Sequence, residues 1–460
     1  MRVGGRLNSL EVQRRFNVGS KVSEIDWDYT IIPQTASALK EKHGIRFEDT
    51  IVPEDPELAD RLFDAGLEML LSLGVYCMDT KRTLKLSEEE IWDAIECAPR
   101  SITVGRGLDE VSIGARHGNA RKRPVVNGGP TAATVSERLY SKMMESYAQE
   151  SIVDTLYCGV ANTFKGAAVQ SGTPSEMYNI MAEMKAIDLA KSNVGRPGMA
   201  VFGPESAITA TSRISVNLPN MGMLPTDGHD IPMMNELKVN RTGMMMQAAC
   251  EISGSVIMTE ALPIYGGYAG GAEETAICDV AESLAAFVVC GSHIHVDGPI
   301  HLKHGTSTRR ETLRVLGHVG VALDRNTDFL LGSMYYVGAG PCTEMCFLEN
   351  AAQALVDAAS GREFSAMSAS AKGSALDKTT GMEARFAGKT LQAASGMKVE
   401  DVNYALDAII KQYESVTDIP EGYRFQDCYD LSTLEPTSFH QEVYAITADK
   451  LRPLGIDIRD

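Results

Sequence analysis

The chain of 460 residues carries a formal net charge of −18. This excludes nucleic acids and anionic membrane surfaces as partners, because both are polyanions. The apolar fraction of 44% and the charged fraction of 23% are typical of a globular protein with a sizeable core. Nine widely spaced cysteines indicate free thiols in a reducing compartment. Because the chain shows no signal-peptide pattern and no uninterrupted run of ~18 apolar residues, we expect a cytoplasmic protein without a membrane span.

The first 120 residues are predicted to form a mainly helical N-terminal extension. Apolar residues recur at helical spacing over 24–42, 56–73 and 87–97. Two of these segments begin with helix-start signals, Asp55 before Pro56 and Ser87 three residues before Glu90. Short β-prone pieces follow at 101–104 and 110–113.

From about residue 121 to 400, short apolar runs alternate with helix-length amphipathic segments. The runs cover 124–127, 153–158, 199–202, 214–216, 256–258, 288–295, 328–331 and 364–368. The helical patterns cover 134–149, 175–191, 233–252, 273–287, 307–323, 343–359 and 384–394. Eight strands with helical crossovers predict a parallel sheet closed into a (β/α)8 TIM barrel, an α/β fold. The alternative is an open doubly wound sheet, because little helix separates the third run from the fourth. Residues 401–460 form a short C-terminal extension with one helix at 402–415.

Chemistry in such a barrel is expected at the carboxyl ends of the strands. The side chains that follow the apolar runs are Asn127, Glu205, Thr211, Glu236, Glu260, His293, His295, Met334, Tyr336 and Ser368. A carboxylate at the depth of Glu260 is costly unless it is paired or bound to a ligand. Gly266, Gly267, Gly270 and Gly271 follow it; they indicate either tight turns or close backbone approach to a bulky ligand.

The strongest competing pattern is a histidine cluster formed by His293, His295, His301 and His304. Two histidines separated by one residue on a strand share a face, as in barrel zinc hydrolases. The pair lies on the sixth run rather than the first, so we expect no bound metal and assign His295 to the pocket as an acid, base or hydrogen-bond donor. Cys342 and Cys346 have no second cysteine pair at zinc spacing, which favours core packing.

Several motifs together resemble the monomethylamine methyltransferase family of methanogens over nearly the whole chain. They are the segment GPESAITATSRIS at 203–215, Asn235-Glu236-Leu237-Lys238, Glu260 with PIYGGYAGG at 263–271, Tyr335-Tyr336 with AGPCTEMC at 339–346, and DKTTGMEAR at 377–385. The resemblance implies the barrel, and methyl transfer from an amine to the corrinoid of a separate protein. When the Gly-Pro-Glu motif is aligned, the pyrrolysine position of the family falls on Thr211.

The resemblance also implies roles for individual residues. It places Glu236, Glu260 and Tyr336 in the amine pocket, with Tyr335, Thr211, Glu205 and Met334 as further substrate contacts. Met334 stands where the family is expected to have glutamine. The glycines at 266–271 are assigned to the corrinoid side, and the family suggests a homo-oligomer, possibly a hexamer.

The function predicted from these features is demethylation of a methylated amine. Threonine provides no electrophilic imine to activate a neutral amine, so a permanently charged quaternary ammonium is the expected substrate. The Co(I) corrinoid would be carried by a cognate partner protein. The alternatives are a zinc-dependent barrel hydrolase and an inactive amine-binding homologue.

Overall fold

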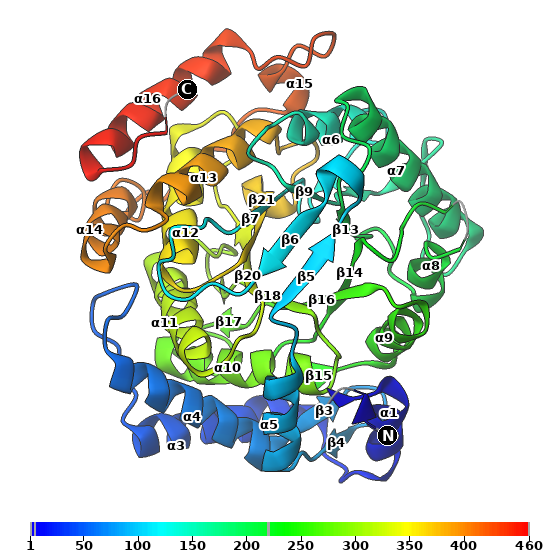
Figure 1. Ribbon diagram of the computed structural model, residues 1–460, viewed down its shortest axis with the longest axis vertical. Coiled ribbons are helices and arrows are strands. Elements are labelled where there is room, and N and C mark those ends of the chain that lie inside the picture. Colours follow the sequence, from blue (N-terminus) through cyan, green and yellow to red (C-terminus); the bar gives the residue numbers. More distant parts are fainter. Residues whose placement is uncertain (1, 4–5, 219–220, 459–460) are drawn as a thin grey trace.

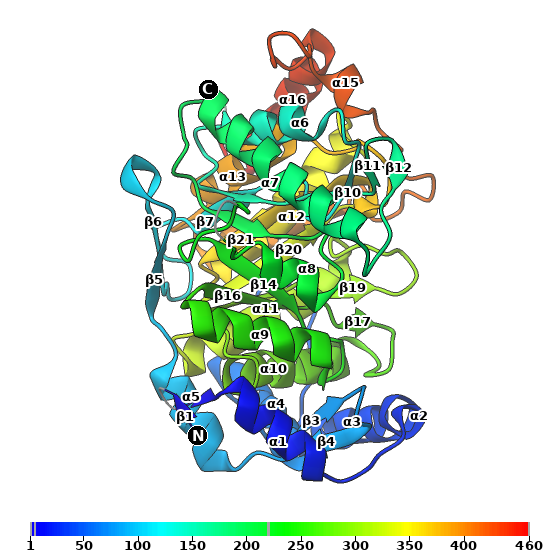
Figure 2. The same ribbon diagram turned by 90° about the vertical axis from the view of Figure 1, so that its right-hand side faces the viewer.

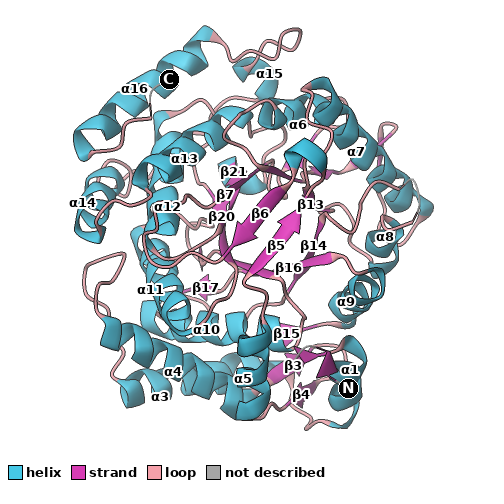
Figure 3. Ribbon diagram, in the orientation of Figure 1, coloured by secondary structure: helices cyan, strands magenta, loops and turns pink. Residues whose placement is uncertain are grey.

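The computed structural model describes residues 2–3, 6–218 and 221–458. Eight parallel strands close into a barrel in the order β13-β14-β16-β18-β20-β21-β7-β9, with helices around it (Figures 1 and 3). The strands are β7 (Val125–Gly128), β9 (Thr155–Tyr157), β13 (Val201–Gly203), β14 (Gly228–Pro232), β16 (Val256–Ala261), β18 (Ile294–Asp297), β20 (Leu331–Tyr336) and β21 (Phe364–Ala369). The predicted closed α/β barrel is confirmed.

The fourth strand lies where the sequence has no apolar run. The predicted run at 214–216 belongs instead to helix α8 (Ala210–Ser215) and the residue after it. The fourth barrel strand is β14, which pairs with β13 on the side opposite β9 and has the sequence Gly-His-Asp-Ile-Pro. His229 and Asp230 are nevertheless buried. Because these buried residues are polar, the strand shows no apolar pattern in the sequence.

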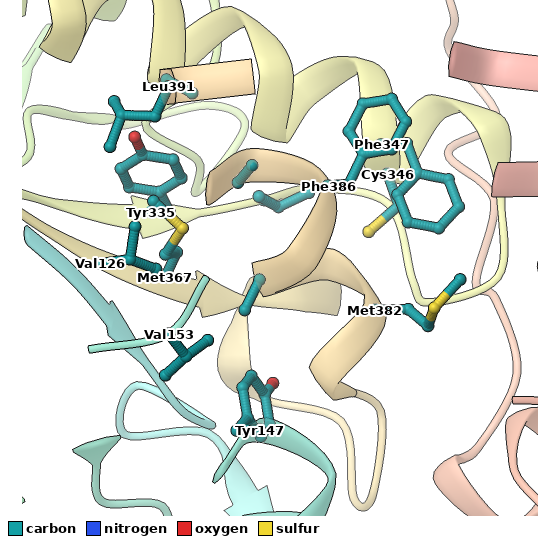
Figure 4. Packing of buried hydrophobic residues seen from close by; sticks show 14 of the residues in the cluster. Val126, Tyr147, Val153, Tyr335, Cys346, Phe347, Met367, Met382, Phe386 and Leu391 are labelled. Atoms are coloured by element: carbon teal, nitrogen blue, oxygen red, sulfur yellow. The ribbon is translucent and has the colours of Figure 1, made fainter. Parts of the chain in front are cut away.

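The outer layer consists mainly of the helices that connect the strands. They are α6 (Tyr140–Ala148), α7 (Pro174–Asn193), α8, α9 (Arg241–Ser253), α10 (Ala272–Val288), α11 (Arg310–Asn326), α12 (Glu344–Ala359) and α13 (Gly381–Ala394). Figure 4 shows part of the apolar layer between strands and helices, where Tyr335 lies among Val126, Met367 and Leu391. Burial of this layer is the main stabilising term of the barrel.

The N-terminal elements pack against one side of the barrel, mainly on α10. They are β1 (Arg2–Val3), β2 (Arg6–Leu7), α1 (Ser9–Val18), α2 (Glu24–Asp26), a π-helical turn (Trp27–Ile31), α3 (Ile32–His43), α4 (Pro56–Leu73), β3 (Val75–Cys77), β4 (Arg82–Leu84) and α5 (Glu88–Cys97). Strands β3 and β4 form a small sheet with β15 (Lys238–Val239), which follows β14. The extension is therefore joined to the barrel by backbone pairing as well as by apolar contact.

The hairpin of β5 (Ser101–Val104) and β6 (Val111–Gly114) covers the amino-terminal end of the barrel (Figures 1 and 2). Val104 and Ile113 pack against interior residues such as Val125 and Phe364. A 3-10 turn (Gly107–Asp109) closes the hairpin, and Gly105 N–H donates to Thr226 C=O just before β14. This end of the barrel is therefore covered by the chain itself.

The opposite, carboxyl-terminal end is surrounded by short strands and by the C-terminal extension (Figure 2). The strands are β8 (Thr134–Val135), β10 (Val160–Ala161), β11 (Thr163–Phe164), β12 (Ala167–Ala168), β17 (Ile264–Tyr265) and β19 (Ile300–His301). The extension contains α14 (Val399–Ile410), α15 (Phe425–Cys428) and α16 (Ser438–Leu451). Two more 3-10 turns cover Ser370–Gly373 and Arg452–Leu454. Among the described residues, every helix is too short or too polar to cross a bilayer.

Candidate functional site

A cluster of ionisable side chains lies inside the barrel, near the carboxyl ends of its strands. Asp230 of β14 and Glu260 of β16 come from neighbouring strands, and Glu205 follows β13. The Tyr157 hydroxyl, from β9, donates a hydrogen bond of 2.7 Å to Asp230 Oδ2. Arg213 of α8 donates to the backbone carbonyl of Asp230, and its Nη2 lies 3.9 Å from Glu205 Oε2. Three carboxyl groups thus share one guanidinium.

Burial and mutual repulsion keep protons on this cluster. Burial is the largest cause that raises the pKa of Glu205 and of Glu260 well above the ordinary carboxyl value, and the nearby Asp230 raises both further. The pKa of Asp230 is raised by burial and lowered by Arg213, by Tyr157 and by its contact with Glu205. Buried like charges at contact distance cannot all ionise when only one cation compensates them. The arrangement is therefore suited to accept one further positive charge.

The cluster has a buried floor and a more accessible upper part. Asp230 and Tyr157 are fully buried, whereas Glu205, Glu260 and Tyr336 are partly exposed. Within the described chain, Glu205 Oε1 and Asp230 Oδ1 meet no hydrogen-bond donor. A small cation entering from the carboxyl-terminal end would meet Glu205, Glu260 and Tyr336 first.

Tyr336 belongs to this site and Met334 lies beneath it. Both side chains belong to the apolar cluster of the barrel interior, which also contains Tyr157 and Phe202. Burial raises the pKa of Tyr336 well above its usual value, with contributions from Glu260, Glu205 and Asp230. The phenol therefore stays neutral and faces the carboxyl groups.

Glu236 does not join the cluster, which corrects the expected convergence with Glu260. Its charged neighbours are Lys238 and Asp28, and burial raises its pKa to about 7. The backbone carbonyl of Glu236 accepts from Trp27 Nε1 at 2.9 Å. The residue thus lies where the N-terminal extension meets the barrel, because the loop after β14 turns outward to form β15.

Thr211 is also outside the barrel interior. It is exposed on α8 and lines a surface cavity of about 610 Å³ together with Met177, Tyr178 and Met181 of α7. A motif alignment that puts a catalytic position on Thr211 would place that position away from the carboxyl cluster. Glu205 and Arg213 of the same segment do reach the interior cluster, and so does Phe202 just before it, whose ring centroid lies 4.9 Å from that of Phe364.

Strand alternation corrects the assignments of Tyr335 and His295 to the pocket. Tyr335 faces the helices, where its hydroxyl donates to Asp357 Oδ2 of α12 at 2.8 Å. His295 lies between Ile294 and Val296, both of which point into the barrel. Its Nδ1 is 2.9 Å from Thr259 Oγ1, and burial followed by the charge of Arg362 lowers its pKa to about 3. It is a neutral imidazole behind the strand and has no contact with the cluster.

The remaining histidines of the sequence pattern are dispersed. His293 Nδ1 accepts from the backbone N–H of Ile257 at 3.0 Å. His301, on β19, and His304 pack ring against ring with centroids 4.5 Å apart. The H-x-H pair therefore divides between different surroundings, which removes the geometric basis for the barrel-hydrolase alternative.

The glycines of the β17–α10 loop lie beyond the end of β16. Gly266 N–H donates to Gly270 C=O at 2.9 Å, and Gly267 N–H donates to Ile264 C=O at 2.8 Å. Gly266 and Gly271 are exposed. Gly266 has a φ of 78° and Gly270 a φ of 125°, values that favour glycine. The loop is a compact turn at the rim of the barrel.

Sequence reasoning missed three residues of the cluster: Asp230, Arg213 and Tyr157. Asp230 was missed because β14 lacks an apolar run. Arg213 lies inside the motif segment at 203–215. The direction of its side chain is set by helix α8, whereas the sequence predicted a strand at 214–216. Tyr157 lies within the predicted run at 153–158, and its alternation with Leu156, which packs in the outer apolar layer, could have identified it as an inward-facing residue.

Comparisons with known proteins agree with this architecture. A family model described as monomethylamine methyltransferase MtmB matches residues 7–456. The chain is 42% identical over 443 residues to MtmB of Methanosarcina mazei and to MtmB2 of Methanosarcina acetivorans, with 96% of each chain covered. Crystal structures of MtmB from Methanosarcina barkeri and of a hydroxylamine MtmB complex each superpose with a TM-score of 0.97, at 40% identity over 99% of both chains. The chain therefore belongs to the monomethylamine methyltransferase MtmB family, a family of methyltransferase enzymes.

Proposed function

We propose that the protein transfers a methyl group from a quaternary ammonium compound to the Co(I) corrinoid of a separate protein. The observation that carries this proposal is the carboxyl cluster of Glu205, Asp230 and Glu260, which has a single guanidinium partner. Arg213 offsets one negative charge, so a bound cation can replace a proton that the cluster would otherwise hold. Family membership supports both the reaction class and a corrinoid protein as methyl acceptor.

The chemistry of the cluster favours a permanent cation over a protonated amine. A primary ammonium ion beside a buried carboxylate can return its proton to the carboxylate, which leaves a neutral amine and a poor leaving group. A quaternary nitrogen has no proton to lose. The faces of Tyr336 and Phe202, which belong to the same interior cluster, suit a cation surrounded by methyl groups. The chain contains only standard amino acids, so no imine side chain is available to activate a neutral amine.

The methyl group moves in a single displacement. The electron pair of Co(I) forms the new bond to the methyl carbon, while the C–N bond breaks and its electron pair passes to nitrogen. The products are a neutral tertiary amine and a methylated cobalt that is formally Co(III), and no proton is required. Glu205, Glu260 and Tyr336 hold the cation with one methyl group directed toward the open end of the barrel, so that orientation is the main contribution of the protein.

We assign the methyl acceptor to the carboxyl-terminal end of the barrel. The glycine loop from 266 to 271 lies at this rim, and its small exposed residues permit close approach of another protein. The hairpin of β5 and β6 covers the opposite end, which leaves the rim as the side from which a corrinoid can reach the cluster.

The test is methylation of a Co(I) corrinoid protein, followed by the change in corrinoid absorption. The substrate panel contains tetramethylammonium, choline, glycine betaine and monomethylamine, and mass spectrometry identifies the demethylated amine. We expect turnover with at least one quaternary compound and none with monomethylamine. Efficient turnover of monomethylamine, without activity on any quaternary amine, would contradict the proposal.

A further inference from the structure

A second cluster of reactive side chains lies outside the barrel interior, where the C-terminal extension meets the barrel. Cys342, Cys428 and His440 each offer one sulphur or ring-nitrogen atom, and these atoms lie within 4.8 Å of one another. All three residues are buried. Thiolate sulphur and imidazole nitrogen are the donors that Zn²⁺ prefers in proteins.

His440 is incompletely hydrogen-bonded in this cluster. Its side chain is fully buried, and neither ring nitrogen has a hydrogen-bond partner of good geometry within the described chain, although Glu383 Oε1 lies 3.4 Å from Nε2. Buried polar atoms without partners are rare and costly, and they call for a missing proton, water or ion. The imidazole is held beside the Phe347 ring with centroids 5.7 Å apart, so it cannot turn to solvent to find a partner.

A buried carboxylate stands next to the imidazole. Glu383 Oε1 lies 3.4 Å from His440 Nε2 and accepts from the backbone N–H of Cys342 at 3.4 Å. Its other oxygen accepts from the Thr380 hydroxyl. Metal-bound histidines usually have such a carboxylate beside them, which orients the ring and strengthens its basicity.

We propose that Cys342, Cys428 and His440 bind a Zn²⁺ ion through three protein ligands, with Glu383 as the carboxylate partner of the histidine. The proposal replaces the sequence-based expectation of a protein without bound metal and of core packing as the role of Cys342. Cys346 lies beside Ser370 and Asn350. The site was not visible as a motif because its three ligands come from separate parts of the chain.

The ion would fasten the C-terminal extension to the rim of the barrel. Cys342 precedes α12 in the loop after β20, whereas Cys428 ends α15 and His440 lies in α16. Backbone hydrogen bonds already join the two parts, from Gly340 N–H to Pro420 C=O at 2.9 Å and from Tyr423 N–H to Pro341 C=O at 3.1 Å. The same loop continues from the strand that carries Tyr336, so the metal would hold one wall of the barrel mouth.

The experiment measures zinc in the purified full-length protein by elemental analysis. The protein is then stripped with a chelator and titrated with Zn²⁺ alone. The variants are Cys428→Ser and His440→Phe, with Cys97→Ser as control because Cys97 is an exposed cysteine outside the cluster. We expect about one zinc per chain in the wild type and the control. Loss of a ligand should raise the Kd for Zn²⁺ by more than about 100-fold, since loss of an outer partner alone costs 10–100-fold.

Three results would overturn the proposal. They are a Cys342–Cys428 disulfide in the freshly purified protein, nine free thiols with no tight uptake of Zn²⁺, and unchanged zinc content in both variants. If the variants do not fold, the wild type loaded with Co²⁺ decides. A sulphur-to-cobalt charge-transfer band supports thiolate ligation, and its absence rejects the site. None of these readouts depends on methyl transfer, so the metal site and the proposed function fail independently.

Discussion

At Glu260, the cost of burying a carboxyl group is only partly offset by other groups of the protein. Arg213 lowers the pKa of Glu260, but burial and Asp230 raise it by more. A buried carboxyl group without full compensation lowers the stability of the free protein, and its presence therefore indicates a ligand-binding role. A bound cation would supply the missing compensation.

Replacement of Glu260 by glutamine should weaken cation binding without unfolding the protein. Loss of one charge-assisted contact costs about 1.5–3 kcal/mol, which corresponds to a rise of about 10- to 150-fold in Kd. Calorimetric titration with tetramethylammonium measures the effect. Glu442→Gln is the control because Glu442 is exposed on α16, and its Kd should equal that of the wild type. Equal affinities for both variants would show that Glu260 does not contact the ligand.

Cation binding should tighten as the pH rises. The carboxyl groups of Glu205, Asp230 and Glu260 all have a raised pKa. The groups that face them are Arg213, Tyr157 and Tyr336. They hold protons above the ordinary carboxyl pKa of about 4, so a cation must displace a proton. Each proton released makes Kd fall by up to about tenfold per pH unit. Titration of tetramethylammonium from about pH 6 to about pH 8 tests this linkage, and a Kd that does not change, or that rises, would contradict it.

The same cluster predicts how the stability of the free protein depends on pH. Between the ordinary carboxyl pKa and the raised pKa values of Glu205, Asp230 and Glu260, the folded state holds more protons than the unfolded state. The contribution of the cluster to the unfolding free energy therefore falls as pH rises from about 4 until the raised pKa values are passed. Denaturant unfolding at several pH values should show this loss, and saturating tetramethylammonium should reduce it.

At the scale of the element, strand β20 carries two adjacent tyrosines with different roles, one in packing and one in the proposed binding site. Tyr335 faces Asp357 of α12, and Tyr336 faces the carboxyl cluster. Since neighbouring side chains on a strand point to opposite sides, the same substitution should reduce stability at position 335 and cation binding at position 336.

Leucine at position 335 should lower the unfolding free energy by about 2–4 kcal/mol, because a buried ring and its hydrogen bond to Asp357 are lost. The affinity for tetramethylammonium should be unchanged. Leucine at position 336 should have a small effect on stability and cost about 0.5–2 kcal/mol of cation binding, because an aromatic face is removed. Denaturant unfolding and calorimetry on both variants form a matched pair. A binding defect at 335 without one at 336 would reverse our assignment of the strand faces.

The sequence predicted elements better than it predicted the site. Apolar periodicity located seven of the eight barrel strands at least in part and most of the surrounding helices, because burial of one face sets the pattern. It failed at β14, whose buried residues are the polar His229 and Asp230. For the site, strand ends identified Glu205, Glu260 and Tyr336, and the resemblance singled out Tyr336 but kept Tyr335 as a further contact, which the structure places against the outer helices. Whether a side chain points into or out of the barrel depends on the register of its strand. Hydrogen bonds to neighbouring strands set that register, and local composition does not.

At the scale of the whole molecule, the net charge of −18 and the carboxyl cluster act in the same sense. The overall field attracts cations and repels anions, and salt weakens this long-range effect. The interior cluster then selects for charge at short range. A charged ligand and a neutral ligand of the same shape should therefore behave differently.

Choline and its neutral isostere 3,3-dimethyl-1-butanol provide this comparison. A ligand at 100 times its Kd adds about 2.7 kcal/mol to the unfolding free energy. We expect choline to raise the melting temperature and the neutral isostere to leave it unchanged. Stabilisation of similar size by both compounds would indicate a pocket that recognises shape alone, and would remove the electrostatic basis of the proposed function.

The β5–β6 hairpin closes the barrel interior at one end, and this has a kinetic consequence for access to the carboxyl cluster. If the corrinoid protein caps the one mouth during transfer, the amine substrate must enter before the cap arrives, and the demethylated amine can leave only after the cap departs. The two substrates should then add in compulsory order. Labelled amine bound to the enzyme alone should exchange freely with an unlabelled pool, and the docked partner should hold it in place until it dissociates.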